Sequence, residues 1–540
     1  MFKYINVHTI KRLVLLLILN GKDFNMNKVT RVFYISAIVA ILFIIWGVIP
    51  DSVLHQGNLD NVTSVIQGFL VDKFGWFYLI SATGFLGFAI YLIFSRYGNI
   101  KLGKPGDKPE YSYITWFAML FSAGMGIGLV FWGAAEPLSH FHAPPYGDAE
   151  TKEAAKTAMQ YSFFHWGVHP WAIYATLALA LAFFKFRKQS SGLVSDILEP
   201  LFGDHIKGKW GTLIDTIVVF ATVFGVATSL GFGAIQISGG LSMVFGLNQT
   251  FLLNLMIIII VTVLYLTSAM TGLNKGIKYL SNTNIVLAIA LMLFLLFAGP
   301  TNYIMNLFTT TFGSYLQNLP SMSLRMTPFD PENSNWIKDW TIFYWAWWIA
   351  WSPFVGTFIA RVSRGRTIRE FVLGVMLVPT IFGALWFSVF GGTAINLEFF
   401  QDANIIESVN AIGEEAALFA VLEHVPFGTI MAIIAILLIS TFFITSADSA
   451  TFVLGMQTTG GSLYPPNKVK LIWGLIQSGA AAVLLWQGGL TALQTASIIV
   501  AFPFTIIMIF IVISLLKAFR EEKEQIDMKK RRRSKQDKNV

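Results

Sequence analysis

The aromatic residues of one apolar stretch are the first candidates for chemistry. The stretch runs from residue 340 to 360, and four of its tryptophans are Trp345, Trp347, Trp348 and Trp351. Tryptophans that anchor a protein in a membrane lie at the ends of a span, whereas these lie in its middle. Aromatic faces attract cations, and they suit a quaternary ammonium group because it is lightly hydrated and donates no hydrogen bonds. The stretch therefore indicates a cavity lined by aromatic rings.

A second aromatic group lies earlier in the chain. Trp171 and Tyr174 are three residues apart and share one helical face, and Trp166 precedes them across a Gly/Pro irregularity. Alone, such a group is typical of an aromatic belt at the membrane interface. Together with Trp348 it favours a box of rings, in which each face would contribute on the order of 1–2 kcal/mol to binding a desolvated cation.

Hydroxyl and carbonyl oxygens form the second candidate site. Thr445 and Ser446 offer hydroxyls near the end of a later apolar stretch, although hydroxyls in membrane helices commonly bond to the preceding turn. The glycine segment 124–128 predicts either a close helix contact or a break in an earlier helix, and a break would free the carbonyls of Ser122 and Met125. Such hard oxygen atoms are suitable ligands for Na⁺.

Composition places these residues in a membrane. The chain has 540 residues, of which 55% are hydrophobic and 13% charged, and its mean hydropathy of +0.63 excludes a water-soluble globular protein. Since it has no cysteine, disulfides, thiolate metal sites and catalytic thiols are excluded as well. About twelve apolar runs are long enough to cross a bilayer: residues 32–50, 74–94, 111–133, 158–184, 212–242, 248–270, 284–299, 340–360, 371–393, 427–454, 468–486 and 491–516.

Two of these spans point to an internal repeat. The third carries the glycine segment and the eighth carries Ser352-Pro353, so we expect both helices to be interrupted. Five-span units in tandem face opposite ways in the membrane, which fits an inverted repeat. The expected division is an N-terminal cytoplasmic segment (1–27), two peripheral helices (28–110), a first five-helix repeat (111–300), an extracellular connection (301–339), a second five-helix repeat (340–516) and a basic cytoplasmic tail (517–540).

Two connecting regions leave alternatives open. The first half of 301–339 is amphipathic, which fits either a helix on the membrane surface or a plain extracellular connection. Residues 1–25 contain an apolar core too short to span, and Met26 is an alternative start of translation.

The positions of lysine and arginine predict the orientation. These residues follow the second, fourth and eighth spans, whereas the alternate loops lean acidic, so both termini are expected to face the cytoplasm from the cell membrane. The basic run 529–533 follows the last span. It fits contact with anionic lipid, either as a topology signal or in regulation, and it does not indicate a nucleic-acid partner.

Other charged residues receive simpler interpretations. Glu136 follows the third span, where solvation near the outer surface explains it. His140 and His142 are expected in a loop, and two histidines without a third ligand do not predict a metal site. Asp448 is expected to pair with one of the arginines that follow the eighth span. The sequence shows no grouping of nucleophile, base or metal ligands, so we do not expect an enzyme.

Five strings together carry a resemblance to a known family: FSAGMGIGLVFWGAAEPL, HWGVHPWAIY, ATVFGVATSLGFG, YWAWWIAWSPFVGTFIARVSRGRTIREF and FFITSADSATFVLG. In order and spacing they resemble the betaine/carnitine/choline transporter family over residues 28–520. The resemblance implies an all-α membrane protein of about twelve transmembrane helices, with a five-plus-five inverted repeat after two additional helices. It also implies a homotrimer that imports a quaternary-ammonium solute by sodium-coupled alternating access.

The resemblance also assigns site residues. It implies an aromatic box of Trp166, Trp171, Tyr174 and Trp348, with Trp347 and Trp351 beside the substrate path and Gly124, Met125 and Gly128 at the opened third span. It implies a sodium site of Ser122, Met125, Phe442, Thr445 and Ser446, and no other cofactor. Some members hold a second sodium, for which Thr222 and Phe354 are present, but Val226 stands where a second threonine is needed. A two-ion stoichiometry is therefore left open.

Substrate choice is argued from charge. Choline-type relatives tend to carry an aspartate at the position of Gly128, as a countercharge for a net cation. A stretch without a carboxylate suits a zwitterion such as glycine betaine, whose own carboxylate can meet backbone N–H groups. Sodium-independent members of the family carry an arginine near the ion site, whereas the centres of the relevant spans here lack lysine and arginine. The resemblance therefore implies sodium-coupled uptake, with osmotic protection as its use. A choline or carnitine transporter of the same family is the alternative, and a channel is a more distant one.

Overall fold

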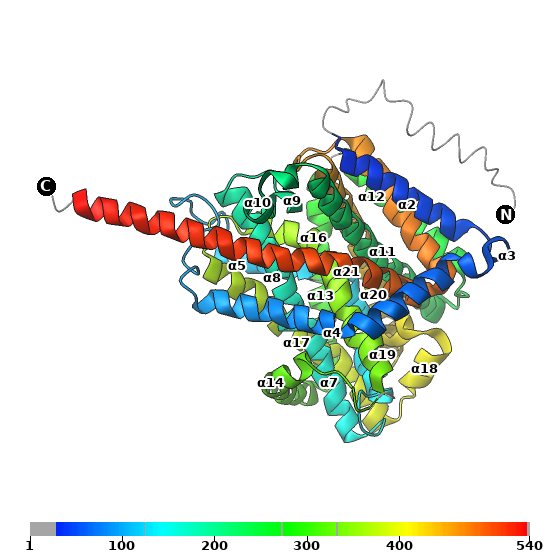
Figure 1. The fold of residues 1–540 in the computed structure, drawn as a ribbon. Coiled ribbons are helices and arrows are strands. Elements are labelled where there is room, and N and C mark those ends of the chain that lie inside the picture. The colour runs from blue at the N-terminus through cyan, green and yellow to red at the C-terminus, as the bar shows by residue number, and fades with distance from the viewer. Residues whose placement is uncertain (1–28, 125, 272–273, 331–332, 537–540) are drawn as a thin grey trace.

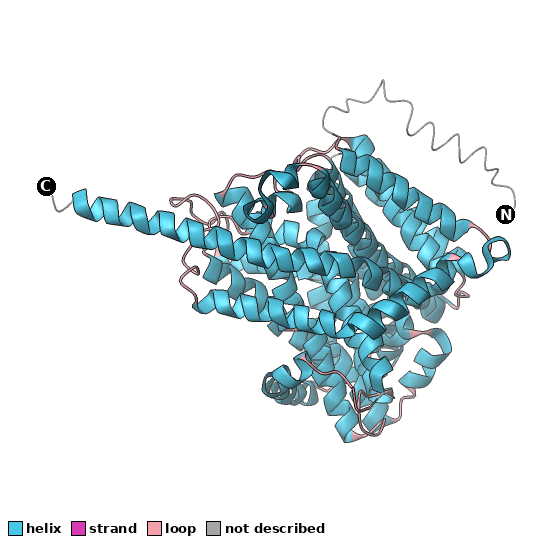
Figure 2. Ribbon diagram, in the orientation of Figure 1, coloured by secondary structure: helices cyan, strands magenta, loops and turns pink. Residues whose placement is uncertain are grey.

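The chain folds into a bundle of helices (Figure 1). The computed structural model describes residues 29–124, 126–271, 274–330 and 333–536. Within these residues every named element is a helix, and the only β-type pairing is an isolated bridge between Lys101 and Thr367 (Figure 2). The predicted all-α class is confirmed.

The elements of the first half of the chain are α2 (Arg31–Val48), α3 (Asp51–Leu54), η1 (His55–Gly57), α4 (Leu59–Phe94), α5 (Tyr113–Gly124), α6 (Ile127–His142), α7 (Lys152–Trp166), α8 (Val168–Ala182), η2 (Phe183–Arg187), α9 (Val194–Ile197), α10 (Glu199–Phe202), η3 (Gly203–Lys207), α11 (Lys209–Phe245) and α12 (Phe251–Thr271). Those of the second half are α13 (Asn274–Ala298), α14 (Thr301–Ser323), α15 (Ser334–Ile337), η5 (Lys338–Ile342), α16 (Phe343–Val362), α17 (Ile368–Gln401), α18 (Ile405–Ile412), η6 (Glu414–Ala416), α19 (Ala417–Glu423), α20 (Gly428–Thr458) and α21 (Asn467–Gln536).

In the described part of the chain, nine helical segments are long and apolar enough to cross a membrane: Arg31–Val48, Leu59–Phe94, Lys152–Arg187, Lys209–Phe245, Phe251–Met270, Tyr279–Ala298, Ile368–Gln401, Gly428–Thr458 and Asn467–Lys529. The difference from twelve has three sources. The third span consists of two short helices, the four tryptophans and the polar residues of α16 lower its mean hydropathy, and α21 contains two of the predicted runs. The number of crossings therefore stays a prediction, as do the inverted repeat and the domain limits.

A backbone break inside α21 separates the last two predicted spans. Gly488 has φ −156° and ψ 19°, and Gly489 has φ 60° and ψ −134°. A positive φ of this kind is accessible to glycine at little cost. The break falls between the predicted runs 468–486 and 491–516, as their boundaries require.

The third span is broken and the eighth is not. Helix α5 ends at Gly124 and α6 begins at Ile127, after an extended Gly126, which confirms the predicted break. Helix α16, in contrast, continues through Ser352 and Pro353. The predicted interruption of the eighth span is therefore wrong, because a proline in a packed helix removes one backbone donor and need not end the helix.

Helix α14 forms the first part of the connection 301–339, and its place on the membrane surface stays a prediction. It is fastened to the bundle through Tyr315, whose hydroxyl accepts a hydrogen bond from the backbone N–H of Val168 at 3.0 Å. Gly167 lies at this contact, between α7 and α8. A Cβ there would lie 2.4 Å from both Phe163 O and Tyr315 Oη, so the close approach requires glycine.

The basic connections meet at one end of the bundle. The backbone N–H of Leu102 donates to Arg366 O at 2.8 Å, and Arg364 forms an ion pair with Asp107. Arg187 lies 2.7 Å from Glu522 at the base of the C-terminal extension, which projects from the bundle as a helix (Figure 1). The loops predicted to share one side of the membrane therefore do contact one another, and the extension of α21 leaves from the same side.

Candidate functional site

Four rings from three helices converge in the interior. Trp166 closes α7, Trp171 and Tyr174 lie in α8, and Trp348 lies in α16. The rings of Trp166 and Trp348 meet edge to face with centroids 4.8 Å apart, and Tyr174 lies 6.0 Å from Trp348. Trp171 extends the group at 5.6 Å from Tyr174. The structure thus brings together the four residues predicted for the aromatic box, and all four are buried.

A small cavity lies between these rings. Its lining is mainly aromatic and glycine: Gly126, Gly128, Leu129, Trp166, Pro170, Trp171, Tyr174, Trp347, Trp348 and Trp351. Its volume is about 20 Å³, which is room for about one water molecule. The indole of Trp347 stacks on that of Trp348, with centroids 4.6 Å apart and 19° between the planes. The rings are therefore closed on one another, and a larger guest requires them to separate.

The first turn of α6 faces the same cavity. Gly126 caps this helix, and both Gly126 and Gly128 line the cavity. A helix N-terminus presents unpaired N–H groups and the positive end of the helix dipole, so it suits a carboxylate. The cavity therefore combines π faces for a cation with a backbone site for an anion.

Part of the predicted site lies outside the described residues. This holds for Met125 as a whole and for the side chains of residues 121–124. Helix α5 places the backbone of Ser122 and Gly124 at its C-terminal end. The contributions of Ser122, Gly124 and Met125 to substrate or ion binding stay predictions.

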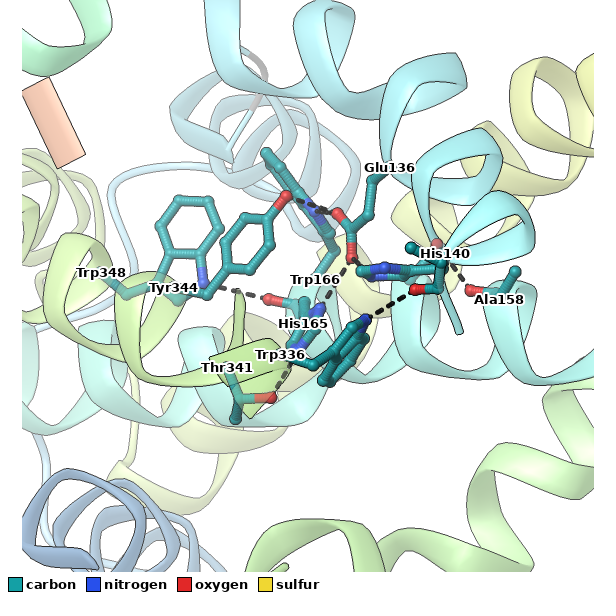
Figure 3. Close-up of polar contacts among 11 residues, drawn as sticks. Glu136, His140, Ala158, His165, Trp166, Trp336, Thr341, Tyr344 and Trp348 are labelled. Carbon is teal, nitrogen blue, oxygen red and sulfur yellow. Dashed lines mark hydrogen bonds and ion pairs between the residues drawn. The ribbon is translucent and has the colours of Figure 1, made fainter. Parts of the chain in front are cut away.

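A buried carboxylate stands behind the box, and sequence reasoning placed it wrongly. Glu136 is fully buried, and its Oε2 accepts hydrogen bonds from the indole N–H of Trp166, at 2.8 Å, and from the Tyr344 hydroxyl (Figure 3). Its Oε1 lies 2.7 Å from His165 Nδ1 and 3.2 Å from His140 Nε2. The predicted solvated position is wrong because α6 continues past Glu136 and packs this carboxylate between α7 and α16.

The predicted loop position of His140 and His142 is wrong as well. His140 and His142 belong to the last turn of α6, where His140 is buried and His142 pairs with exposed Glu150 at 2.7 Å. Glu136, His140 and His165 bring three donor atoms within 4.8 Å of one another, which is a metal-like grouping. Hydrogen bonds among these atoms, and from neighbouring donors, already account for the arrangement, so we do not assign a metal to it.

The predicted sodium ligands of the tenth span lie in an unbroken helix. In α20 the hydroxyl of Thr445 donates to Thr441 O at 3.0 Å and accepts from the side-chain amide of Asn284 at 3.0 Å. Ser446 and Phe442 lie on the wall of a larger cavity, which Asn284 also lines. The Oδ1 atom of Asn284 is buried without a hydrogen-bond partner, so this side chain adds a free oxygen beside Thr445.

The residues predicted for the second sodium site are Thr222 and Phe354, and the Thr222 hydroxyl already has hydrogen-bond partners. Thr222 Oγ1 donates to Val218 O at 2.8 Å and lies 3.2 Å from the side-chain amide of Gln457. Phe354 lines the larger cavity and contacts Trp351, with ring centroids 5.6 Å apart. The hydroxyl of Thr222 is thus already engaged, and the second site stays a prediction.

The larger cavity has a volume of about 730 Å³. It extends from Trp351, which also borders the small cavity, to Arg361 at the end of α16 and to exposed Tyr464. Asp448 lines this cavity and interacts electrostatically with Lys470. Arg364 forms its ion pair with Asp107. The expected pair of Asp448 with an arginine is not among the ion pairs of the described residues.

Comparison with known proteins identifies the family. The profile described as "BCCT, betaine/carnitine/choline family transporter" matches residues 31–524. The chain belongs to this family. It is therefore a multi-pass membrane transporter and not an enzyme, as the composition and the family resemblance predicted.

Several relatives are similar along nearly their whole length. The "Glycine betaine transporter OpuD" of Bacillus subtilis (strain 168) is 54% identical over 503 residues, which cover 93% of this chain and 96% of that protein. The "Probable glycine betaine transporter" of Desulfitobacterium hafniense (strain Y51) is 46% identical, covering 92% and 98%. The "Ectoine/hydroxyectoine transporter" of Virgibacillus pantothenticus is 45% identical, covering 94% and 100%.

Sequence reasoning missed Glu136, His165 and Asn284 as members of these sites. Glu136 and His140 are four residues apart, a spacing that places them on one helical face. An ionisable residue in an apolar segment indicates a functional site by default. Extending the third span to His142 would have applied that rule to Glu136, but nothing local to Asn284 indicates that Thr445 is its partner.

Proposed function

We propose that this protein imports glycine betaine together with Na⁺ across the cell membrane, with both termini in the cytoplasm. The observation that carries the proposal is the small cavity, in which the rings of Trp166, Trp171, Tyr174 and Trp348 converge on the glycine-lined start of α6. Rings bind a trimethylammonium group through cation–π attraction, and the helix start binds a carboxylate. Glycine betaine carries both groups one methylene apart.

The names of two relatives support this substrate. Two of them carry glycine betaine in their names, at 54% and 46% identity. The ectoine/hydroxyectoine transporter, at 45% identity, makes a cyclic zwitterion a second candidate substrate. Gly128 supports a zwitterion over choline, because the choline-type aspartate is absent from this position.

Sodium coupling is supported by the oxygen atoms beside the larger cavity. Thr445 and Ser446 supply hydroxyls, Phe442 supplies a carbonyl, and the free Oδ1 of Asn284 adds a fourth oxygen. Uncharged oxygens of this kind suit Na⁺ because they bind the ion weakly enough for it to be released. One Na⁺ entering down a potential of about 100 mV releases about 2.3 kcal/mol before its concentration gradient is counted.

The two cavities suggest how access alternates. Trp351 borders both, so it separates the closed aromatic box from a cavity of about 730 Å³ that reaches the end bearing Arg361. In the proposed orientation that end is cytoplasmic. Movement of α16 relative to α6 would open the box to one side at a time.

Two partners complete the proposal. We expect the protein to assemble as a homotrimer, which native mass spectrometry in detergent would test. The basic end of α21 is expected to lie on anionic lipid, and sedimentation of the protein's C-terminal peptide with vesicles containing anionic lipid would test this contact.

The test of the function is uptake into proteoliposomes. Labelled glycine betaine, ectoine, choline and carnitine are compared with an inward Na⁺ gradient and with K⁺ in its place. Accumulation of betaine above its external concentration, only with Na⁺, is expected. Preference for choline or carnitine would favour the alternative substrates, and equal uptake in K⁺ would contradict sodium coupling.

A further inference from the structure

The carboxylate of Glu136 is one ring away from the proposed substrate. Trp166 donates its indole N–H to Glu136 Oε2 at 2.8 Å. Trp166 also lines the small cavity, and its Cη2 atom, at the far edge of the indole, faces the lining residue Gly128. Tyr344, whose hydroxyl also bonds to Oε2, stacks on Trp348 with ring centroids 5.8 Å apart and 22° between the planes. The carboxylate therefore reaches the cavity by two routes, directly through Trp166 and through Tyr344 to Trp348.

The same network holds Trp348. Its indole N–H donates to the backbone carbonyl of His165 at 3.0 Å (Figure 3). The imidazole of His165 is held in turn by Glu136 at Nδ1 and by Thr341 Oγ1 at Nε2, at 2.7 and 3.0 Å. Glu136 thus contacts one ring of the box directly and the other through one residue.

Four donors converge on this carboxylate, which is the environment of an ionised group. The indole of Trp166 can only donate to it, the Tyr344 hydroxyl donates to it, and neutral imidazoles of His140 and His165 can donate as well. His140 Nδ1 is buried and has no hydrogen-bond partner. A charged imidazolium would need an acceptor there, so His140 is the neutral tautomer with its proton on Nε2.

The charge of Glu136 therefore lacks a permanent counterion. Among the described residues, its ion-pair contacts are with His140 and His165 alone, and no lysine or arginine joins them. A buried charge without an opposite charge is unfavourable by itself. A cation that enters the box approaches this charge through the indole of Trp166, and the attraction is strong because the site excludes water.

We infer that Glu136 is a positioning residue that supplies a buried negative charge behind the aromatic box and so strengthens the binding of cationic head groups. The indole N–H group that points at the carboxylate shifts electron density toward the ring face that meets the substrate. The inference rests on the proposed function, because it assigns a role in the affinity of that same box. The ligand class is a trimethylated or otherwise delocalised cation, whichever carboxylate or hydroxyl it carries.

The decisive variant is Glu136→Gln, which removes the charge and can keep most of the network. The amide oxygen accepts from Trp166 and Tyr344, and the amide NH₂ donates to His165 Nδ1 once that ring carries its proton on Nε2, where Thr341 Oγ1 accepts it. The contact with His140 Nε2 is given up, because His140 Nδ1 has no acceptor for a proton. Sodium-driven betaine uptake is expected to show a KM about tenfold higher and a maximal rate near that of the parent. The matched control is Glu153→Gln, at an exposed acidic residue in the first turn of α7, which should leave KM unchanged.

An uncharged analogue of the substrate's head group separates the effect of charge from the effect of shape. 3,3-Dimethylbutyrate has the outline of glycine betaine with carbon in place of the quaternary nitrogen. Its inhibition of betaine binding should be no weaker in Glu136→Gln than in the parent. An equal loss for both ligands would overturn the inference, because it would show a distorted box instead of a missing charge.

Trp166→Phe gives an independent variant, should Glu136→Gln fail to fold. It keeps an aromatic face but loses the N–H that contacts Oε2, and a KM raised about fivefold or more is expected. A KM within twofold of the parent in whichever folded variant is measured would overturn the inference. If the parent itself takes up no betaine, the proposed function fails instead, so the two failures are distinguishable.

Discussion

Gly128 lies directly against the indole of Trp347: a Cβ on this glycine would lie 2.4 Å from Trp347 Cη2 and 3.2 Å from Trp166 Cη2. Atoms of a packed aromatic cluster cannot yield that much space without moving a whole ring. The glycine at position 128 is therefore fixed by steric fit to the rings, in addition to any effect of charge.

Gly128→Ala should raise the KM for betaine about tenfold or more, because the added methyl group displaces Trp347 and Trp166. Gly128→Asp should lose betaine uptake without gaining choline uptake, since its larger side chain meets the same indole. The control is Gly87→Ala in α4, where an added Cβ meets nothing within 4 Å. Measured choline uptake by Gly128→Asp would show that the rings adapt, contrary to this expectation.

Trp348→Ala removes the ring that contacts both Trp166 and Tyr174. Loss of one cation–π face of a desolvated cation should raise the KM for betaine about 5- to 30-fold. Trp210→Ala, at a tryptophan that is 65% exposed, serves as the control. Unchanged betaine uptake by Trp348→Ala would remove the box from the account of binding.

Asn284→Leu and Thr445→Ala should raise the Na⁺ concentration needed for half-maximal uptake, because each removes an oxygen at the proposed ion site. Loss of one ligand oxygen is expected to cost about tenfold in Na⁺ affinity. Thr441→Ala is the control, since its hydroxyl bonds only to carbonyls of the preceding turn of α20. A sodium dependence that is unchanged in both variants would place the ion elsewhere.

Glu522→Ala should release the C-terminal extension of α21 from the bundle. Glu522 contacts Arg187 at 2.7 Å and Lys188 at 2.8 Å, and these bonds hold the base of the extension. Limited proteolysis should cut the extension faster in this variant than in the control Glu524→Ala, whose acidic residue is exposed.

Truncation after Glu521 tests whether the tail regulates transport. If betaine uptake by the truncated protein is still activated by raised osmolality, the osmotic sensor lies outside the tail.

Glu415 predicts a pH dependence of stability. It lies in η6, between two spans, and burial raises its pKa to about 7. Since the folded-state pKa lies above the unfolded one, the carboxyl favours folding in its protonated form, and this contribution fades as pH rises from about 4.5 to 7 and beyond.

Glu415→Gln should therefore raise the melting temperature at pH 8 by about 1–2 °C and leave it nearly unchanged at pH 5. The amide keeps an oxygen for the contact with Gln249, 3.3 Å away in the parent. A stabilisation of the same size at both pH values would show that the carboxyl does not titrate in this range.

The aromatic box was accessible from sequence because tryptophans in mid-span have few other uses in a membrane. The break of the third span was less certain from sequence, because the glycine segment 124–128 also fits a close helix contact. The predicted interruption of α16 was wrong because the effect of Pro353 depends on packing by neighbouring helices, which the local sequence does not specify. Glu136 shows the same limit, since two of its partners, Trp166 and Tyr344, are 30 and 208 residues away.

The broken α5–α6 pair and the continuous α16 are expected to differ in stiffness. An unbroken helix of 20 residues transmits displacement as a stiff rod, so the tryptophans that it carries keep their mutual register as it tilts. In the proposed mechanism, the break beside Gly126 would be the flexible point of the α5–α6 pair. Substrate release would then depend on the hinge yielding around a rigid aromatic wall, and substitutions that stiffen the hinge should slow turnover more than they weaken affinity.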